Sequence, residues 1–229
     1  VTLESLAQFH RQLKGQAQAL KGQTDVVFLG DSITESYRGT DFNQPCPQDR
    51  CAGVPAIFRK HFGRRALALG IAADETQHLL WRLKDGEMGS LQPRAVVVLM
   101  GTNNFGIGNM SSLEVAQGVA AVVEVLLQRD RSSEVLVMGV LPRAKHGTFR
   151  VRIRRANALL QTMCAHNNRL TFVDCSQVFM GPDRVLNRSR MDDLLHPNAV
   201  GLDAMFGECL RPTVEQMMMQ KMGEHEGES

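Results

Sequence analysis

Five short apolar runs, separated by longer segments with helical spacing, constrain the fold of this chain more than any other feature. Apolar runs of this length are typical of strands that are buried on both faces of a parallel sheet. Parallel neighbours need long crossover connections, and these are right-handed in almost all known proteins. The runs are Val26 to Leu29, Ala66 to Leu69, Ala95 to Met100, Val135 to Val140 and Leu170 to Val173.

The segments between the runs carry apolar residues three and four positions apart, which predicts helices that each cover one face of the sheet. The sequence therefore predicts an α/β protein, a three-layer α/β/α sandwich around a five-stranded parallel sheet. In such folds the ligand site forms outside the carboxyl ends of the strands. The helical sets are Leu79, Leu80 and Leu83; Val115, Val119, Val122, Val123 and Leu126; and Ala156, Leu159, Leu160 and Met163.

Size and charge narrow the classes of function. The chain has 229 residues, which fits one domain, and its formal net charge is +2. So small a charge argues against a general affinity for nucleic acid, and an aromatic content of 5% argues against a base-stacking surface. No apolar run approaches the ~20 residues of a membrane helix, so we expect no stable membrane insertion. These exclusions leave a small-molecule substrate as the expected partner.

The five cysteines are odd in number and scattered, so they do not form the framework of a small disulfide-rich domain. We expect most of them to be reduced or buried. Cys46 and Cys51 could form one local bridge in an oxidising compartment. The compartment stays open: the cytoplasm is slightly favoured, and secretion would require a leader removed before Val1.

A serine follows the first run, in Gly30-Asp31-Ser32-Ile33-Thr34-Glu35. A serine at a strand-to-helix turn exposes its hydroxyl above the sheet beside backbone amides, as an acyl-transfer nucleophile requires. The alternative is structural, because Ser32 and Glu35 also fit the Ser-x-x-Glu capping box.

An asparagine follows the third run, in Gly101-Thr102-Asn103-Asn104. At the carboxyl edge of a sheet, the amide of Asn103 can donate to a developing oxyanion. Asparagine and glycine are also ordinary turn residues.

A third polar segment near the C-terminus contains Asp193 and His196. In a helical turn, residues three apart share a face, so Asp193 can orient the imidazole of His196. A metal site and a solvated loop are the alternatives, although no second cluster of ligands supports a metal. All three segments fall where this fold presents its site, and together they supply nucleophile, base, orienting acid and oxyanion donor.

These segments resemble the motif blocks of the SGNH (GDSL-like) hydrolases, which end in Asp-x-x-His. The resemblance spans about 26–210 and leaves an N-terminal helix in 1–25 and a frayed, solvated tail in 217–229. Within this family, the sequence is similar above all to the esterases related to platelet-activating-factor acetylhydrolase catalytic subunits. The matching stretches are Val26 to Ser32, Thr76 to Lys84 with its Leu-Trp-Arg-Leu, Gly101 to Asn104, and Leu141-Pro142-Arg143.

The resemblance implies a flavodoxin-like sandwich and a serine esterase that needs no cofactor or metal. It makes Ser32 the nucleophile, His196 the base, Asp193 its orienting acid and Asn103 an oxyanion donor, together with the backbone N–H of Ser32. The neighbouring positions Asp31, Gly70 and Gly101 support the site.

One position departs from the family pattern. The second block usually reads Asn-x-Gly-x-x-Gly, and its last glycine donates a backbone N–H to the oxyanion; here Ala73 stands at that place. Ala73 still has an N–H to donate. If the backbone there needs a positive φ, alanine costs roughly 1–2 kcal/mol.

The resemblance favours hydrolysis of short acyl esters, acetyl above all. A carbohydrate O-deacetylase with the same residues is the first alternative, and a weakened binding or scaffold protein on this fold is the second. The first βα turn lacks the glycine spacing of a phosphate-binding loop, which disfavours a nucleotide site. Analogy of fold suggests a homodimer. The single tryptophan, Trp81, is expected in the core because it lies among apolar residues.

Overall fold

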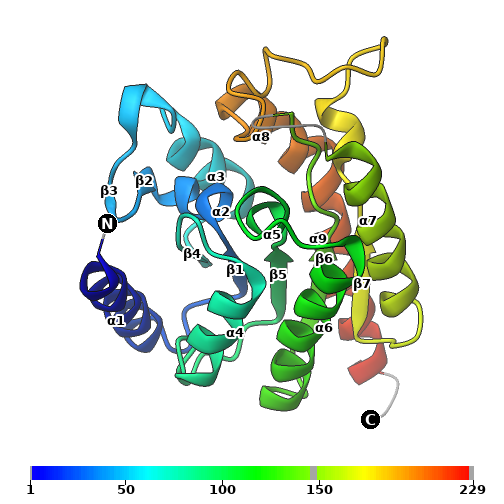
Figure 1. Cartoon of the computed structure of the whole chain (residues 1–229). Helices are drawn as coiled ribbons and strands as arrows, with labels where there is room; N and C mark the ends of the chain where they lie inside the picture. Colours follow the sequence, from blue (N-terminus) through cyan, green and yellow to red (C-terminus); the bar gives the residue numbers. More distant parts are fainter. Residues whose placement is uncertain (1, 145–148, 227–229) are drawn as a thin grey trace.

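The computed structural model describes residues 2–144 and 149–226 and places the five apolar runs in one parallel sheet (Figure 1). The strand order is β4-β1-β5-β6-β7, and every neighbouring pair is parallel. This confirms the α/β class and the five-stranded sheet. The strands are β1 (Val26–Gly30), β4 (Ala66–Gly70), β5 (Ala95–Leu99), β6 (Glu134–Met138) and β7 (Leu170–Val173).

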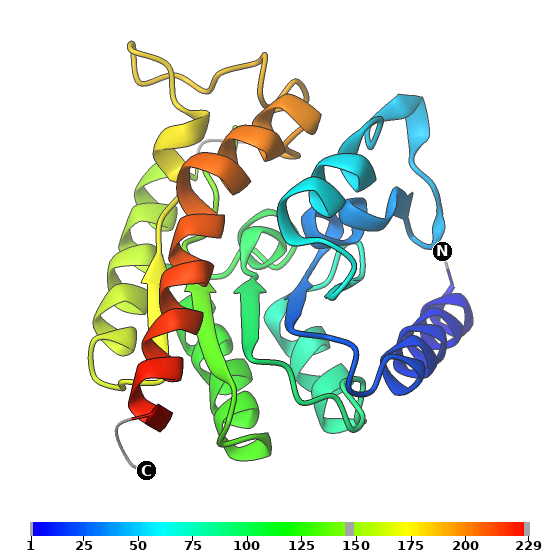
Figure 2. The same ribbon diagram turned by 180° about the vertical axis from the view of Figure 1, so that it is seen from behind.

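Helices cover both faces of the sheet because successive strand side chains point to opposite sides. Val27 and Leu29 of β1 join one apolar cluster, whereas Val26 and Phe28 join another. The first cluster is closed by α1 (Leu3–Ala19), α4 (Thr76–Lys84), α6 (Ser112–Arg129) and α7 (Arg150–Cys164). The second is closed by α3 (Val54–Phe62), α8 (Ala199–Met205) and α9 (Arg211–Glu226) (Figure 2).

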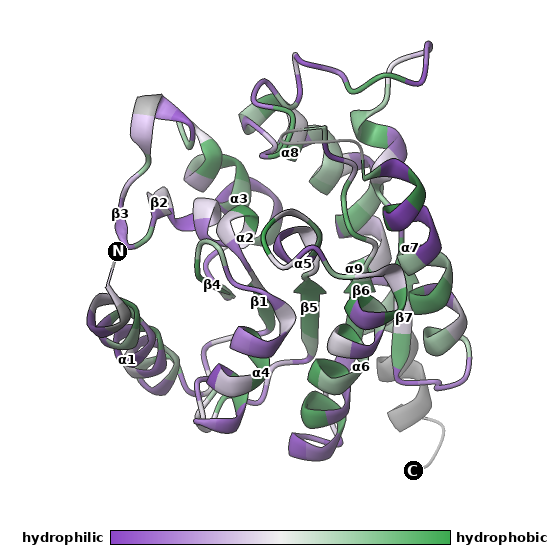
Figure 3. Ribbon diagram, in the orientation of Figure 1, coloured by the Kyte–Doolittle hydropathy of each residue, from purple (hydrophilic) through white to green (hydrophobic). Residues whose placement is uncertain are grey.

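The hydropathy of the ribbon matches these layers (Figure 3). The central strand β5 is buried at all of its residues, and its arrow is hydrophobic along its length. Two short helices begin at the carboxyl ends of strands, namely α2 (Ser32–Glu35) after β1 and α5 (Thr102–Gly106) after β5. The fold thus brings the polar segments that follow β1 and β5 to one edge of the sheet.

The C-terminal segment differs from the expected solvated tail, because α9 continues to Glu226. Met217 is buried against the second cluster, which explains why the helix does not end before it. Residues 217–226 are therefore helical and not frayed, although Met219 is exposed as a solvated tail would be, and residues 227–229 lie outside the described part. No helix in the described ranges is long and apolar enough to cross a bilayer.

The segment between Gly39 and Gly53 contains a small hairpin and a disulfide. Strands β2 (Thr40–Asp41) and β3 (Gln44–Pro45) pair antiparallel, and Cys46 is bonded to Cys51. The remaining short elements of the chain are η1 (Ser36–Arg38), η2 (Pro47–Asp49), η3 (Ser176–Phe179) and the π-helical η4 (Phe206–Leu210).

A second disulfide joins Cys175, just before η3, to Cys209 in η4. Most cysteines were expected to be reduced or buried: Cys51, Cys164 and Cys175 are buried, but four of the five are bonded and not reduced. The bridge left open between Cys46 and Cys51 is present. Cys164 is a buried free thiol. Spacing could not reveal the second bridge, because 34 positions separate its cysteines.

Candidate active site

Ser32 lies at the first turn of α2, directly beyond the carboxyl end of β1. Its Oγ is 2.9 Å from Nε2 of His196, a residue 164 positions away in the chain. Ser32 is only 6% exposed, so the nucleophile candidate is almost completely buried. Asp31 is the N-cap of α2, and Glu35 bonds elsewhere, so the capping-box interpretation of Ser32 and Glu35 is wrong.

His196 is held from its far side by Asp193. Oδ2 of Asp193 accepts a hydrogen bond from Nδ1 of His196 at 2.7 Å, which leaves Nε2 free to accept a proton. Oδ1 accepts from the backbone N–H groups of His196 and Leu195, at 2.7 and 2.9 Å. The turn is not the expected helical one, because Leu194 has a φ of +62°. It nevertheless brings the carboxylate and the imidazole together.

Ala73 occupies the turn after β4 and adopts a φ of +66°. This is the left-handed region, so the alanine carries a strain of roughly 1–2 kcal/mol that glycine would not have. The flanking residues are fixed: the Ala72 N–H donates to Oε2 of Glu35 at 2.7 Å, and the Asp74 carbonyl accepts from Nδ2 of Asn103 at 3.0 Å.

Asn103 is buried in the first turn of α5, beside the turn that carries Ala73. One amide hydrogen goes to the Asp74 carbonyl, and the second is the one that could reach an oxyanion. Gly101, the N-cap of α5, has a φ of +119°, and a Cβ there would lie 2.7 Å from Cγ1 of Val115. Gly70 is equally constrained, because a Cβ would lie 2.4 Å from the backbone N of Glu35. Both glycines let the chain approach the site closely.

Asp31 is 1% exposed, and its Oδ1 accepts the backbone N–H of Ile33 at 3.0 Å. Burial is the main cause, together with the nearby charge of Asp74, that raises the pKa of this carboxyl to about 7. Its Oδ2 has no hydrogen-bond partner among the described residues. Asp31 therefore stabilises the start of α2 through its hydrogen bond to Ile33.

Two buried charged residues near the site make contacts that the sequence analysis did not predict. Nε of Arg82 donates to Oδ2 of Asp74 at 2.8 Å, and its Nη2 donates to the Gly30 carbonyl at 3.2 Å. Glu35 is fully buried and bonds to the turn of Ala72. A charged residue inside an otherwise core-like segment is the only sequence signal of either role, and it names no partner.

A cavity of about 460 Å³ lies between α1, α4 and the turn that carries Ala73. Trp81 lines it and is 55% exposed, so the expectation that this tryptophan lies in the core is wrong. Leu79 and Leu83 share the inward face of α4, and Trp81 stands two residues from each, on the other side. A larger depression of about 710 Å³, lined by Glu124 and Arg169, adjoins the amino end of β7 and is far from the site.

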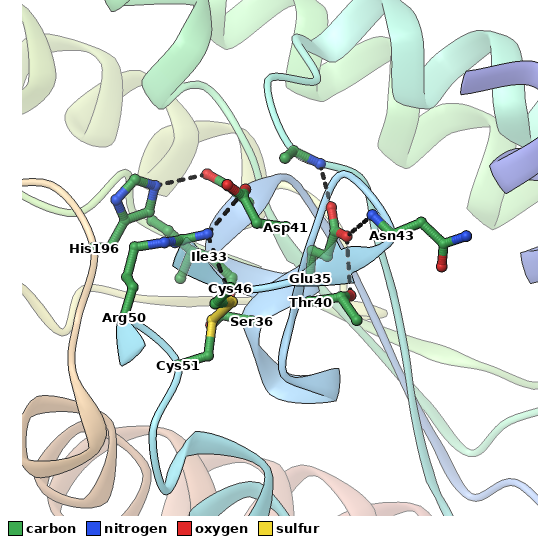
Figure 4. The surroundings of a disulfide bond; sticks show 12 residues. Ile33, Glu35, Ser36, Thr40, Asp41, Asn43, Cys46, Arg50, Cys51 and His196 are labelled. Atoms are coloured by element: carbon green, nitrogen blue, oxygen red, sulfur yellow. Dashed lines mark hydrogen bonds and ion pairs between the residues drawn. A yellow bond between two sulfur atoms is a disulfide. The ribbon is translucent and has the colours of Figure 1, made fainter. Parts of the chain in front are cut away.

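The loop with the Cys46–Cys51 bridge borders the site (Figure 4). Nη2 of Arg50 lies 2.9 Å from Oδ1 of Asp41, which ties the two sides of this loop together, and His196 lies in the surroundings of the disulfide. Within the described ranges, no group of three or more His, Cys, Asp or Glu side chains could hold a metal ion.

A serine, an imidazole and a carboxylate in series, at the carboxyl edge of this sheet, agree with the family comparison. The profile described as "GDSL-like Lipase/Acylhydrolase family" matches residues 28–204. The chain belongs to this family. It is thus an acylhydrolase, a hydrolase of carboxylic esters, and the resemblance found in its motifs is confirmed.

Relatives of known sequence and structure agree with this assignment. The chain is 33% identical over 204 residues to "Platelet-activating factor acetylhydrolase IB subunit alpha1" of Bos taurus, covering 88% of this chain and 80% of that protein. A GDSL-like lipase from Bacteroides thetaiotaomicron has a TM-score of 0.68 at 22% identity, covering 93% and 98% of the two chains. A carbohydrate esterase family 3 protein from Talaromyces cellulolyticus has a TM-score of 0.60 at 17% identity, covering 86% and 99%. These two structures share the fold.

Proposed function

We propose that this acylhydrolase is a serine esterase for short-chain esters, acetyl esters above all, and that it works through an acyl-enzyme on Ser32. The observation that carries the proposal is the series from Ser32 Oγ to His196 Nε2 and from His196 Nδ1 to Asp193. This order of nucleophile, base and orienting acid is the one that acyl transfer requires. The name of the bovine relative supports acetyl as the acyl group.

In the first half of the reaction, Ser32 attacks the ester carbonyl while His196 takes its proton. The charge of Asp193 stabilises the imidazolium that forms. The carbonyl oxygen becomes an oxyanion, which accepts hydrogen bonds from the N–H groups of Ser32 and Ala73 and from the Asn103 side chain. His196 then protonates the leaving alcohol, and the acyl group remains on Ser32.

In the second half, a water molecule replaces the alcohol. His196 takes a proton from this water, and the resulting hydroxide attacks the acyl carbonyl through a second oxyanion in the same place. Collapse releases the carboxylic acid and returns the proton to Ser32. Because the imidazole must be neutral to act as a base, hydrolysis should fall in acid.

Covalent labelling tests this proposal. A fluorophosphonate probe should modify Ser32 in the folded protein, and labelling should disappear in Ser32→Ala. Denatured protein is the control for non-specific reaction. Absence of labelling in folded wild-type protein would contradict the esterase proposal. It would favour the alternative of a weakened binding protein, which the strained Ala73 in the oxyanion turn suggests.

A carbohydrate O-deacetylase is the second candidate, favoured by structural similarity to a carbohydrate esterase. The two candidates use the same residues and differ in the alcohol. Nitrophenyl esters of increasing acyl length, run beside acetylated sugars, separate them. Faster release of acetate from acetylated sugars than from nitrophenyl acetate, by Ser32-dependent hydrolysis, would favour the deacetylase.

A further inference from the structure

Glu35 is a buried carboxylate that the mechanism above does not use. It ends α2, three residues after Ser32, and its side chain is 0% exposed. A carboxylate removed from water is costly unless its oxygens accept hydrogen bonds or meet a positive charge. Its contacts therefore indicate what it holds.

Both oxygens of Glu35 accept hydrogen bonds from other segments. Oε2 accepts the backbone N–H of Ala72 at 2.7 Å. Oε1 accepts the backbone N–H of Asn43 at 2.8 Å and the hydroxyl of Thr40 at 2.9 Å. The nearby guanidinium of Arg38 adds positive charge and itself donates to the Gly70 carbonyl at 2.7 Å. One carboxylate thus joins the helix of Ser32, the turn after β4 and the hairpin loop, and Figure 4 shows Glu35 between Thr40 and Asn43.

The contact with Ala72 stands next to the strained residue. Ala73 has a φ of +66°, a conformation that an alanine leaves when nothing holds it. The turn is fixed at Ala72 by Glu35 and at Asp74 by the amide of Asn103, and Ala73 lies between these two anchors. Loss of either anchor lets the peptide at Ala73 rotate, and its N–H then points elsewhere.

We propose that Glu35 is a positioning residue of the oxyanion hole, because its carboxylate holds the Ala72–Ala73 turn in the left-handed conformation that aims the Ala73 N–H. The proposal rests on the proposed esterase function. If Ala73 were a glycine, the turn would adopt the left-handed conformation without strain and would depend less on the contact with Glu35.

A double-mutant cycle with the variants Glu35→Gln and Ala73→Gly tests the proposal. Glutamine is nearly isosteric, but its NH2 group cannot accept the hydrogen bonds that one carboxylate oxygen now accepts. With the alanine in place, Glu35→Gln should lower kcat by about 10- to 100-fold and change KM little, because a misplaced donor acts in the transition state. In the Ala73→Gly background, the same substitution should cost at least about fivefold less in kcat, since the two residues act on one turn.

Two further readouts separate positioning from a loss of folding. The affinity for an alkylboronic acid, which forms a tetrahedral adduct, should fall in parallel with kcat in Glu35→Gln, whereas the affinity for the product acid should not. Thr40→Val is the matched control, because it removes a donor to Oε1 and leaves the Ala72 contact. It should retain wild-type kcat. If Glu35→Gln does not fold, Glu35→Asp, which keeps the charge but is too short to reach Ala72, enters the same cycle.

The outcomes are distinct from those of the proposed function. Fluorophosphonate should label Ser32 completely in Glu35→Gln, only more slowly, because the probe also develops a negative oxygen in the hole. Equal losses of kcat in both backgrounds, or an unchanged labelling rate, would overturn the positioning role while leaving the esterase intact. No labelling of the wild type would instead remove the esterase proposal itself.

Discussion

The carboxylate of Asp193 accepts both the ring Nδ1–H and the backbone N–H of His196, each at 2.7 Å. The two bonds fix the position of the residue and the tautomer of its ring together. The left-handed Leu194 makes this possible, because it folds the chain tightly enough for a carboxylate three residues back to reach both atoms.

Asp193→Asn should therefore leave the turn in place and remove the activity. The asparagine oxygen can still accept the backbone N–H groups, but its NH2 favours the tautomer in which Nε2 carries the proton and cannot take one from Ser32. We expect kcat to fall on the order of 10³–10⁴-fold, with little change in the thermal midpoint. Steady-state kinetics and calorimetry on the same preparation measure both quantities.

The control is Asp192→Asn, which changes the adjacent, exposed carboxylate. Its Oδ1 accepts a hydrogen bond from Nδ2 of Asn198 at 3.2 Å. Activity should stay at the wild-type level. Equal losses in both variants would mean that the charge of the segment matters and the tautomer does not.

Asn103 and Asn104 form a natural pair, since they are adjacent, buried and identical in chemistry. We expect Asn103→Ala to lower kcat by roughly 10²–10³ because it removes an oxyanion donor. Asn104 instead binds Thr76, by Oδ1 to its backbone N–H at 3.1 Å and by Nδ2 to its hydroxyl at 2.9 Å. Asn104→Ala should cost about 1–3 kcal/mol of unfolding free energy, because it leaves a buried N–H unpaired.

Kinetics and urea unfolding of both asparagine variants test this division. The expected pattern is a large loss of kcat with a smaller loss of stability at 103, where one bond to the Asp74 carbonyl is removed, and mainly a loss of stability at 104. If Asn103→Ala is destabilised as much as Asn104→Ala and keeps its kcat, then Asn103 only anchors the Asp74 carbonyl and does not meet the oxyanion.

The two disulfides should contribute unequally to stability. In the chain-entropy account, the stabilisation grows with the loop that the bond closes. Replacing Cys175 and Cys209, which are 34 positions apart, by alanine should cost about 4 kcal/mol. Replacing Cys46 and Cys51, only 5 positions apart, should cost about 2 kcal/mol.

Peptide mapping without reduction, followed by urea unfolding of both double variants, measures these effects. Alkylation of the native protein should leave all five cysteines unmodified, and alkylation after unfolding without reductant should modify Cys164 alone. Modification of the other four under those conditions would contradict both bridges.

The sheet could be predicted from sequence because β1 and β5, which are buried at every residue, require continuous apolar runs. The half-buried β7 at the edge carries a weaker form of the same pattern, interrupted by Thr171. The catalytic candidates followed from their place after the strands, since Ser32 and Asn103 stand where a parallel sheet opens its site. The tertiary contacts could not be predicted. Nothing local shows that Glu35 reaches Ala72, so a Ser-x-x-Glu pattern favoured a cap that does not form.

Trp81 shows the same limit for helices. Its neighbours have the spacing of a buried stripe, but the inward face passes through Leu79 and Leu83, which puts the tryptophan outside. Apolar spacing identifies an amphipathic helix more reliably than it identifies which side chains are buried. Each step along the helix turns the side-chain direction by about 100°, so a residue close in sequence to the buried ones can face the solvent.

Asp31 gives the protein a stability that should decline as the pH rises. The folded state keeps this carboxyl protonated up to about pH 7, whereas the unfolded chain releases the proton near 3.8. Between these two pH values the unfolded state binds fewer protons than the folded state. The free energy of unfolding therefore falls as the pH rises through this range. The loss reaches its full value above pH 7 and is at most about 4 kcal/mol, at 1.36 kcal/mol per pKa unit.

Asp31→Asn should remove this dependence, because the amide oxygen can still accept the Ile33 N–H and carries no proton to release. Urea unfolding of both proteins at about pH 5 and about pH 8 measures the difference. The variant should gain stability relative to the wild type between these two values, and Asp192→Asn, which changes an exposed carboxylate, should not. A constant difference between Asp31→Asn and wild type at both pH values would show that Asp31 is ionised in the folded state throughout, and that a positive charge compensates its burial.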